Sequence, residues 1–406
     1  MWCSVAINRI GKPPLPKNEI SLPSLFWTFL KVGSTAFGGF MALISVVQSL
    51  VVERRRLLRQ EDMLDGISLA SMLPGPVAVN VVAYVGYRLR GVTGALVAAT
   101  AVILPSFLLI TTLSYVYFRW GQMPAMQKLF MGFIPAVTAI IATTAWGMSV
   151  KAIGTLRETG IMFVSAFVLL NVGGFYSTLA VIVFAGIAGY WLFRSDTGLQ
   201  GSVDAALKST SPSRPKLSVL ALTPVLIAPI AELSAGILAK LFVTFAGMSV
   251  ILFGGGYVFI PMIQEAVVDG QHWVTQTEFI DAIALGQVTP GPILISAAFI
   301  GYKVAGVAGA AVSTIGIFAP PAIIMLIATS MLDRIKNSNA IQACLRGVRP
   351  AVIGMIFAAA VVIGSSAQNH WLSLLIFSTA LVALLRFRIE VVWIIPVSGL
   401  MGLALY

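Results

Sequence analysis

The chain has 406 residues, of which 58% are hydrophobic and only 10% are charged, and its mean hydropathy is +0.95. Soluble domains carry roughly 25% charged residues, so this composition excludes a soluble globular protein and indicates an integral membrane protein. The net charge of +11 does not indicate nucleic acid as a partner, because the Lys and Arg residues stand in short connecting segments, where we expect them to anchor the topology.

Apolar runs recur from about residue 25 to the C-terminus. Gly and Pro inside these runs break the alternating pattern of β-barrel strands, so the sequence predicts an all-α polytopic membrane protein.

Cys3 and Cys344 lie far apart, and two histidines are too few for a His-based metal site, so we expect neither a metal nor a cofactor. The N-terminal segment contains no apolar core of signal-peptide length, and we expect the chain to insert through its own helices.

The chain contains an internal repeat. Residues 37–53, FGGFMALISVVQSLVVE, align with residues 253–269, FGGGYVFIPMIQEAVVD. At the same offset the tripeptide PGP at 74–76 falls on PGP at 290–292. The sequence therefore predicts two copies of one unit, joined by a polar linker.

This repeat divides the chain into five segments. In chain order we expect a cytoplasmic N-terminal segment, a first membrane repeat, a cytoplasmic linker, a connecting transmembrane helix and a second membrane repeat. Their bounds are 1–23, 24–193, 194–216, 217–235 and 236–406.

Positive charge differs between the matched connecting segments of the two copies. Residues 53–59 contain several arginines, whereas the matched segment 269–278 contains neither Lys nor Arg. Conversely, residues 171–175 are uncharged, and their counterpart contains Arg386 and Arg388. Because Lys and Arg gather in cytoplasmic loops, matched loops are expected on opposite sides of the membrane, as in the inverted repeats of many secondary transporters.

With the N-terminus and the linker inside, residues 24–52 and 61–89 must each enter and leave on the cytoplasmic face. We therefore expect two re-entrant helical hairpins, mirrored by outward-facing hairpins at 236–268 and 278–303. The alternative is that each of these segments is one broken helix that crosses the membrane fully.

Each predicted hairpin is interrupted near its middle, either by Phe-Gly-Gly or by Pro-Gly-Pro. An arm of about a dozen residues is ~15–20 Å long, so the tips are expected near the bilayer midplane. The arm that follows each break begins with unpaired N–H groups and the positive end of a helix dipole, which together favour an anion. The sequence therefore predicts up to four helix N-termini converging on a dianionic oxyanion. The alternative is that Gly and Pro only kink helices for packing.

The predicted substrate-binding residues belong to these breaks or lie beside them. They are Lys31, Gly38, Gly39, Ser71, Pro74, Gly75, Pro76, Asn80, Gly254, Gly255, Thr289, Pro290, Gly291, Pro292 and Ser296. Lys31 precedes the first break by six residues, where an ammonium group is costly unless it meets an anion or a carboxylate. The alternative for Lys31 is snorkelling toward the membrane surface.

Four further charged residues have predicted roles. Asp65 and Asp281 occupy matched positions nine residues before PGP, and a carboxyl group that becomes buried there can carry a proton, so both are candidates for proton coupling. The alternative role for these two aspartates is to cap a helix or to pair with Arg at the membrane surface. Arg54 and Arg55 are expected to anchor the inner face and, as a second role, to attract anions toward a cytoplasmic mouth.

At these residues the sequence resembles the chromate ion transporter (CHR) family. The resemblance rests on motifs in both halves: FGG at 37–39, VERRR at 52–56, PGP at 74–76, GYRLRGVTGA at 86–95, FGGGY at 253–257, TPGP at 289–292 and GYKVAGVAGA at 301–310. It implies a two-domain, long-chain transporter that exports chromate across the plasma membrane, with sulfate as competitor and the proton gradient or membrane potential as driver. Some members differ from this chain, which has Phe40, Val77 and Val79 where they carry Pro, Glu and Gln.

The expected partners are therefore a small oxyanion and the lipid bilayer, and a homodimer is left open. A sulfate or other anion permease is the first alternative. An intramembrane enzyme is less favoured, because the 15 Asp and Glu residues stand mostly in loops. A purely structural subunit gains nothing from interrupted helices.

Overall fold

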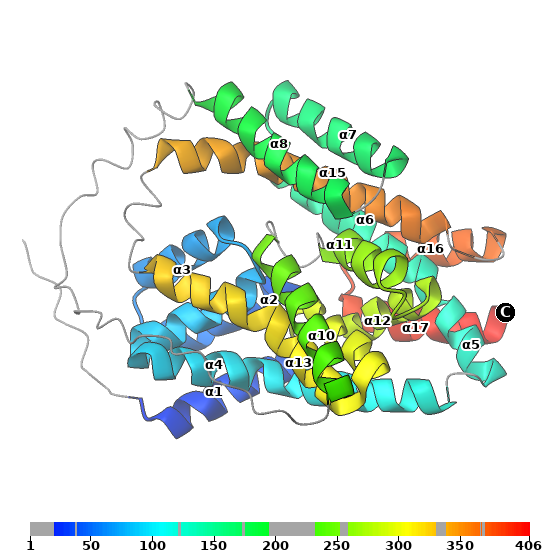
Figure 1. The fold of residues 1–406 in the computed structure, drawn as a ribbon, viewed down its shortest axis with the longest axis horizontal. Helices are drawn as coiled ribbons and strands as arrows, with labels where there is room; N and C mark the ends of the chain where they lie inside the picture. Colours follow the sequence, from blue (N-terminus) through cyan, green and yellow to red (C-terminus); the bar gives the residue numbers. More distant parts are fainter. Residues whose placement is uncertain are drawn as a thin grey trace, which may run out of the picture.

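The computed structural model describes residues 20–36, 39–120, 123–172, 175–194, 232–251, 259–329, 338–365, 367 and 370–406. Throughout these ranges the regular elements are helices, many of which run along the long axis of the molecule (Figure 1). Three predicted site residues, Gly38, Gly254 and Gly255, lie outside the described residues, as does most of the N-terminal segment, the linker and the connecting helix.

The first half contains nine helical elements in the described ranges. They are α1 (Leu22–Thr35), α2 (Gly39–Gln48), the π-helical η1 (Ser49–Arg54), α3 (Gln60–Met72), α4 (Val77–Trp120), α5 (Pro124–Met131), α6 (Phe133–Ala152), α7 (Leu156–Asn171) and α8 (Phe175–Phe193).

The second half follows the same order. Its described elements are α10 (Glu232–Ile251), α11 (Phe259–Gln264), the π-helical η5 (Glu265–Gly270), α12 (Gln276–Val288), the 3-10 turn η6 (Ile293–Ile295), α13 (Ser296–Thr329), α15 (Asn339–Ser365), α16 (His370–Leu385) and α17 (Val391–Leu405).

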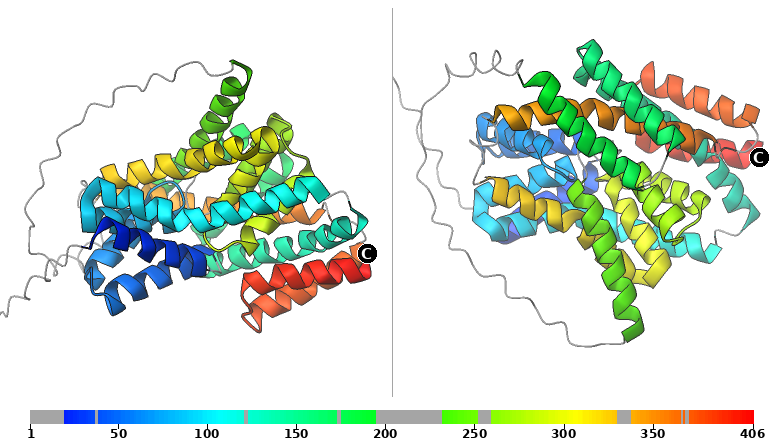
Figure 2. Two further views of the ribbon diagram at one scale, coloured as in Figure 1. Left: turned by 90° about the horizontal axis from the view of Figure 1, so that it is seen from below. Right: turned by 45° about the horizontal axis from the view of Figure 1, so that its top comes forward.

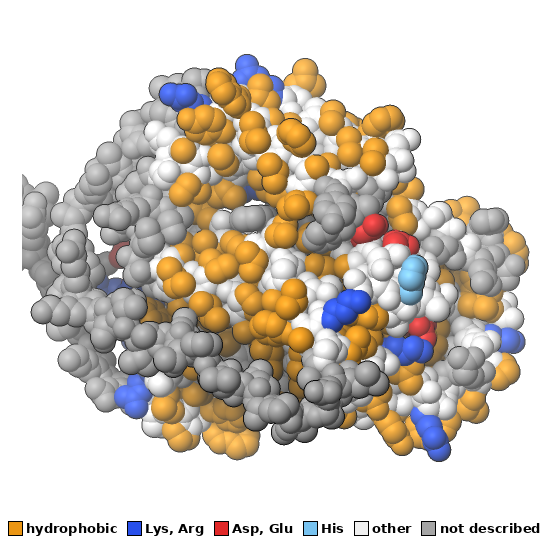
Figure 3. Space-filling model, in the orientation of Figure 1, with side chains coloured by type: hydrophobic (Ala, Val, Ile, Leu, Met, Phe, Trp, Pro, Cys, Tyr) orange, Lys and Arg blue, Asp and Glu red, His pale blue; other side chains and the backbone are white. Residues whose placement is uncertain are grey.

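Length and composition make several helices suitable for crossing a bilayer. In the described part of the chain, four spans meet both criteria: Val77–Trp120, Pro124–Val150, Ile293–Thr329 and Asn339–Ser365. Hydrophobic side chains cover much of the face shown in Figure 3. Large exposed residues such as Phe184, Trp191 and Trp371 suit contact with lipid chains better than contact with water. The prediction of an all-α polytopic membrane protein is confirmed.

The two halves share unusual backbone conformations at matched positions. Arg56 and His272 have φ of 50° and 53°, Gly75 and Gly291 have φ of 101° and 114°, and the matched π-helical turns are η1 and η5. Long helices α4 and α13 each contain one non-helical step, at Arg90–Gly91 and at Ala305–Gly306. The repeat therefore extends from residue types to local geometry.

The halves also interlock through their last two helices. Helices α7 and α8 of the first half pack on α15 of the second, and α16 and α17 of the second half pack on α6 of the first (Figure 1). Between the halves, α4 and α13 run side by side (Figure 2). A functional site built between the two halves is therefore held by both copies.

Candidate functional site

Both PGP segments lie between helices, at buried turns. Helix α3 ends at Met72 and α4 begins at Val77, and α12 ends at Val288 before the short turn η6. The central glycines, Gly75 and Gly291, have the large positive φ that a residue with a side chain adopts only at a cost. Pro74, Pro76, Pro290 and Pro292 are buried beside them. This local geometry explains why Gly stands between two prolines at each turn.

Ion pairs show that the helices around each PGP segment form a hairpin. Arg88 pairs with Asp62 in the first half, and Lys303 Nζ lies 2.8 Å from Glu278 Oε1 in the second. Each acidic residue is in the first turn of the helix before PGP, and each basic residue lies near the kink that ends the following arm. The outer ends of the two arms therefore meet, and PGP forms the tip.

Each PGP tip contacts the long helix of the opposite half. The Ser106 hydroxyl on α4 donates a hydrogen bond to the carbonyl of Pro290, and a Cβ at Gly75 would overlap the side chain of Pro321 on α13. Ser106 and Pro321 occupy matched positions in the repeat. The two tips are therefore seated in equivalent ways, each against the other copy.

The residue before the first FGG motif also contacts a PGP tip. The N–H of Gly291 donates a 3.0 Å hydrogen bond to the carbonyl of Ala36, the residue just before Phe-Gly-Gly. Gly39, the last residue of this motif, begins α2. The structure thus places Ala36, which precedes the first FGG motif, against the second-half PGP tip.

Polar side chains lie buried beside the tips. Asn80 Nδ2 donates to the Pro74 carbonyl at 3.1 Å, and the Thr289 hydroxyl donates to the Gly286 carbonyl at 2.8 Å. Ser296, which matches Asn80 in the repeat, is 1% exposed, and its hydroxyl has no hydrogen-bond partner among the described residues. A buried hydroxyl without a partner is a donor that a bound group can use.

The matched aspartates have different surroundings. Asp281 is 1% exposed, and its Oδ2 accepts a 2.7 Å hydrogen bond from the Tyr117 hydroxyl of α4, while its Oδ1 has no partner within the described ranges. Asp65 is only half-buried. Sequence reasoning missed Tyr117, because the two residues are 164 positions apart and no motif links them.

Four predicted residues lie on exposed surface instead. Lys31 is exposed on α1, Ser71 is exposed and donates to its own helix at Ile67, and Arg54 is exposed at the end of η1. Arg55 is exposed too, and its Nη1 donates to the Thr28 hydroxyl at 2.8 Å. Of the predicted site residues, the structure buries the PGP residues, Asn80, Thr289 and Ser296, and it leaves these four exposed.

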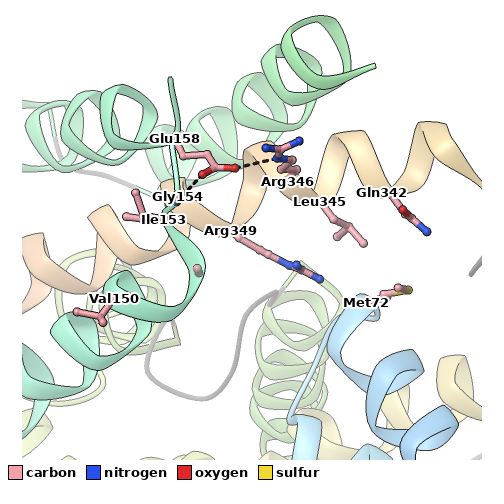
Figure 4. A pocket seen from close by; sticks show the side chains of 10 residues that line it. Met72, Val150, Ile153, Gly154, Glu158, Gln342, Leu345, Arg346 and Arg349 are labelled. Carbon is pink, nitrogen blue, oxygen red and sulfur yellow. Dashed lines mark hydrogen bonds and ion pairs between the residues drawn. The ribbon is translucent and has the colours of Figure 1, made fainter. Parts of the chain in front are cut away.

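A polar pocket of about 570 Å³ opens next to the first PGP hairpin (Figure 4). It lies between the end of α3, the connection from α6 to α7, and α15. Its lining residues are Met72, Val150, Ala152, Ile153, Gly154, Glu158, Gln342, Leu345, Arg346 and Arg349. The sequence signal for it was the change from GFIPAV at 132–137 to GVRPAV at 347–352, which places Arg349 where the first copy has Ile134.

One ion pair crosses between the halves at the wall of this pocket. Arg346 Nε donates to Glu158 Oε1 at 2.8 Å, and Glu158 Oε2 accepts from the N–H groups of Gly154 and Thr155 at 2.8 and 3.0 Å. Burial opposes ionisation of Glu158, but the hydrogen bonds from Arg346 and then from Gly154 and Thr155 outweigh it, so the pKa of this carboxyl is lowered. Glu158 therefore stays ionised and keeps Arg346 engaged.

Comparison with known proteins gives a consistent result over both halves. A family model described as "Chromate transporter" matches residues 23–190 and 239–403. The chain is 30% identical over 389 residues to a chromate transport protein of Cupriavidus metallidurans, covering 95% of this chain and 94% of that protein. It is 31% identical to an uncharacterized transporter of Methanocaldococcus jannaschii, covering 84% of each chain. A chromate transport protein of Pseudomonas aeruginosa is 29% identical, with 94% of this chain and 92% of that protein covered. No solved structure matches.

Proposed function

The chain belongs to the chromate transporter family, and on this premise we propose that it is a secondary active transporter that exports chromate across the plasma membrane. Sulfate, which has the same charge and tetrahedral shape, is the proposed competitor. The proton gradient or the membrane potential is the proposed energy source. The family and the apolar helices make the protein a multi-pass membrane protein, and its relatives are named as transporters.

The two buried PGP tips support this proposal, because each tip contacts the long helix of the opposite half. The arm after the first tip begins at Val77, where a helix N-terminus presents unpaired N–H groups and a positive dipole. The free hydroxyl of Ser296 lies just after the second tip. Backbone donors and a hydroxyl can bind an oxyanion without burying an Arg.

We propose that transport moves the two halves against each other around these tips. Ser106 and Pro321, on the long helices α4 and α13, are the surfaces on which the tips rest. A displacement of one half would change the side of the membrane from which the tips are accessible. Repeat-based secondary transporters alternate access in this way.

Proton coupling is proposed for Asp281 and for its counterpart Asp65. Asp281 is buried with one oxygen held by Tyr117 and the other unpaired, and taking up a proton would remove the cost of an isolated buried charge. Lys31, Arg54 and Arg55 are exposed, so their proposed role is to attract the anion before it reaches the tips.

Transport by everted membrane vesicles tests the proposal. We expect vesicles that contain the protein to accumulate radiolabelled chromate, sulfate to inhibit the accumulation, and dissipation of one of the two gradients to abolish it. The pH gradient and the voltage are set separately with ionophores. Vesicles without the protein are the control. Absence of gradient-dependent chromate uptake would contradict export, and sulfate uptake alone in right-side-out vesicles would favour a sulfate permease.

A further inference from the structure

The pocket beside the first PGP hairpin carries a positive charge that the transport scheme above does not use. Its ionisable lining residues are Glu158, Arg346 and Arg349. Glu158 and Arg346 neutralise each other through their 2.8 Å contact, and Arg346 also lies over the ring of Phe193, 4.5 Å from its centroid. One net positive charge therefore remains in the pocket, on Arg349.

The guanidinium group of Arg349 can donate hydrogen bonds to a ligand that enters this pocket. Its side chain is exposed and makes no ion pair with any residue in the described part of the chain. Figure 4 shows it extending from α15 across the pocket, in the direction of Met72. A guanidinium group presents a planar fork of N–H donors, and this fork matches two oxygens of a tetrahedral anion.

The position of the pocket links it to the hairpin tip. Met72, which lines it, is the last residue of α3 and stands two residues before Pro74. The other walls come from residues 150–158 and 342–349. The first segment contains Lys151 and Arg157 and the second Arg346 and Arg349, so the positive-inside rule assigns both to the cytoplasmic side. The first repeat has Ile134 at the position of Arg349, so the repeat offers no equivalent arginine on the opposite side.

We propose that this pocket is a binding site for a tetrahedral dianion, with Arg349 as its direct ligand, and that it receives the anion on the cytoplasmic side before the first PGP tip. The Glu158–Arg346 pair forms a neutral wall that joins the two halves. The role in transport rests on the proposed function, whereas the binding of a dianion does not.

A binding experiment on the purified full-length protein tests the site directly. The probe is sodium sulfate, with sodium chloride of equal ionic strength as control, and the readout is the thermal midpoint in detergent, which rises when a ligand binds the folded state. We expect Arg349→Gln to weaken sulfate affinity by roughly tenfold or more, because a charge-assisted hydrogen bond is lost. Arg349→Lys should keep part of the affinity.

The matched control is Arg157→Gln. Arg157 is exposed in the first turn of α7, next to the pocket residue Glu158, but does not line the pocket, so its replacement removes one positive charge from the neighbouring surface. We expect this variant to bind sulfate as the unmodified protein does. Equal sulfate affinity in Arg349→Gln and the unmodified protein would overturn the proposal. It would also be overturned if Arg157→Gln lost as much sulfate affinity as Arg349→Gln, because any positive charge on this surface would then have the same effect.

Transport kinetics separate this inference from the proposed function. In vesicles, we expect Arg349→Gln to raise KM for chromate with a smaller change in kcat. If the unmodified protein transports chromate and Arg349→Gln leaves KM unchanged, the site is wrong and the function stands. If no oxyanion is transported but sulfate binding still depends on Arg349, the site stands and the function is wrong.

Discussion

At the scale of single residues, the PGP tips depend on two glycines that have different neighbours. Both Gly75 and Gly291 have a positive φ, but Gly75 faces Pro321 whereas Gly291 faces Ser106 and donates to Ala36. A side chain at either glycine therefore meets two obstacles, backbone strain and a contact with the opposite half. The effect of backbone strain can be measured separately, because Gly91 has a positive φ with open space around it.

We predict that Gly75→Ala and Gly291→Ala abolish most transport while the protein still inserts. Strain at a positive φ costs about 1–3 kcal/mol, and the overlap with Pro321 or Ser106 additionally displaces the tip. Gly91→Ala carries the strain alone and should keep more activity. Vesicle uptake normalised to inserted protein is the measurement. Comparable activity in all three variants would show that the seating of the tips is irrelevant to transport.

A second residue-scale prediction concerns Asp281. Asp281→Asn keeps the shape of the side chain and removes its charge, so we expect uptake to lose its response to the pH gradient while sulfate binding is retained. Asp65→Asn is the matched variant in the first repeat, and its carboxyl is half-buried. Uptake driven by an imposed pH gradient is measured for both. Full coupling in Asp281→Asn would remove this residue from the proton path.

At the scale of elements, close helix crossings hold the halves together. Gly347 of α15 lies against Gly189 of α8, and Gly132 lies against Gly402 of α17 in the matched crossing. A Cβ at any of these glycines would overlap the backbone of the facing helix. Small residues allow such approach, which is the usual source of helix association in membranes.

We predict that Gly347→Ala destabilises the protein. The added methyl would overlap the carbonyl of Ala185, and overpacking of this kind costs about 1–3 kcal/mol, which should lower the thermal midpoint by several degrees. The control is Gly147→Ala on α6, where no atom lies within 4 Å of the added Cβ. Gly147→Ala should leave the midpoint unchanged or raise it, because Ala favours helix over Gly. Similar midpoints for both variants would contradict the close crossing.

At the scale of the whole molecule, the two copies are interwoven. Ala36 contacts Gly291, Tyr117 contacts Asp281, and Glu158 pairs with Arg346. Each of these contacts joins the first half to the second. The orientation of the halves across the membrane is a prediction from charge alone.

Cysteine labelling tests that orientation. Arg56 and His272 are matched, exposed and share the same backbone conformation, so Arg56→Cys and His272→Cys report equivalent points of the two copies. With Cys3 and Cys344 replaced by Ser, we expect an impermeant thiol reagent to label the two positions from opposite faces. Labelling of both from one face would rule out inverted repeats.

Local patterns in the sequence predicted the helical class, the repeat and the buried PGP turns. The helices and the turns depend on residues close together in the chain: apolar runs form the helices and each PGP tripeptide ends one, whereas single prolines such as Pro105 and Pro350 lie inside helices. The match of Asp65 with Asp281 followed from the same alignment. Lys31 and Ser71 show the limit of this reasoning, because their depth in a segment did not reveal which face of the helix they occupy.

Local patterns therefore indicated which segments are apolar helices, whereas the contacts between distant segments are visible only in the folded chain. Ser106 with Pro290 and Glu158 with Arg346 are separated by 184 and 188 positions. Contacts at such separations arise when helices pack, and packing is decided by the fit of whole surfaces that no short motif encodes. For the same reason the sequence placed Arg349 among the topological charges, whereas the structure places it at the wall of the pocket where we propose that it binds a dianion.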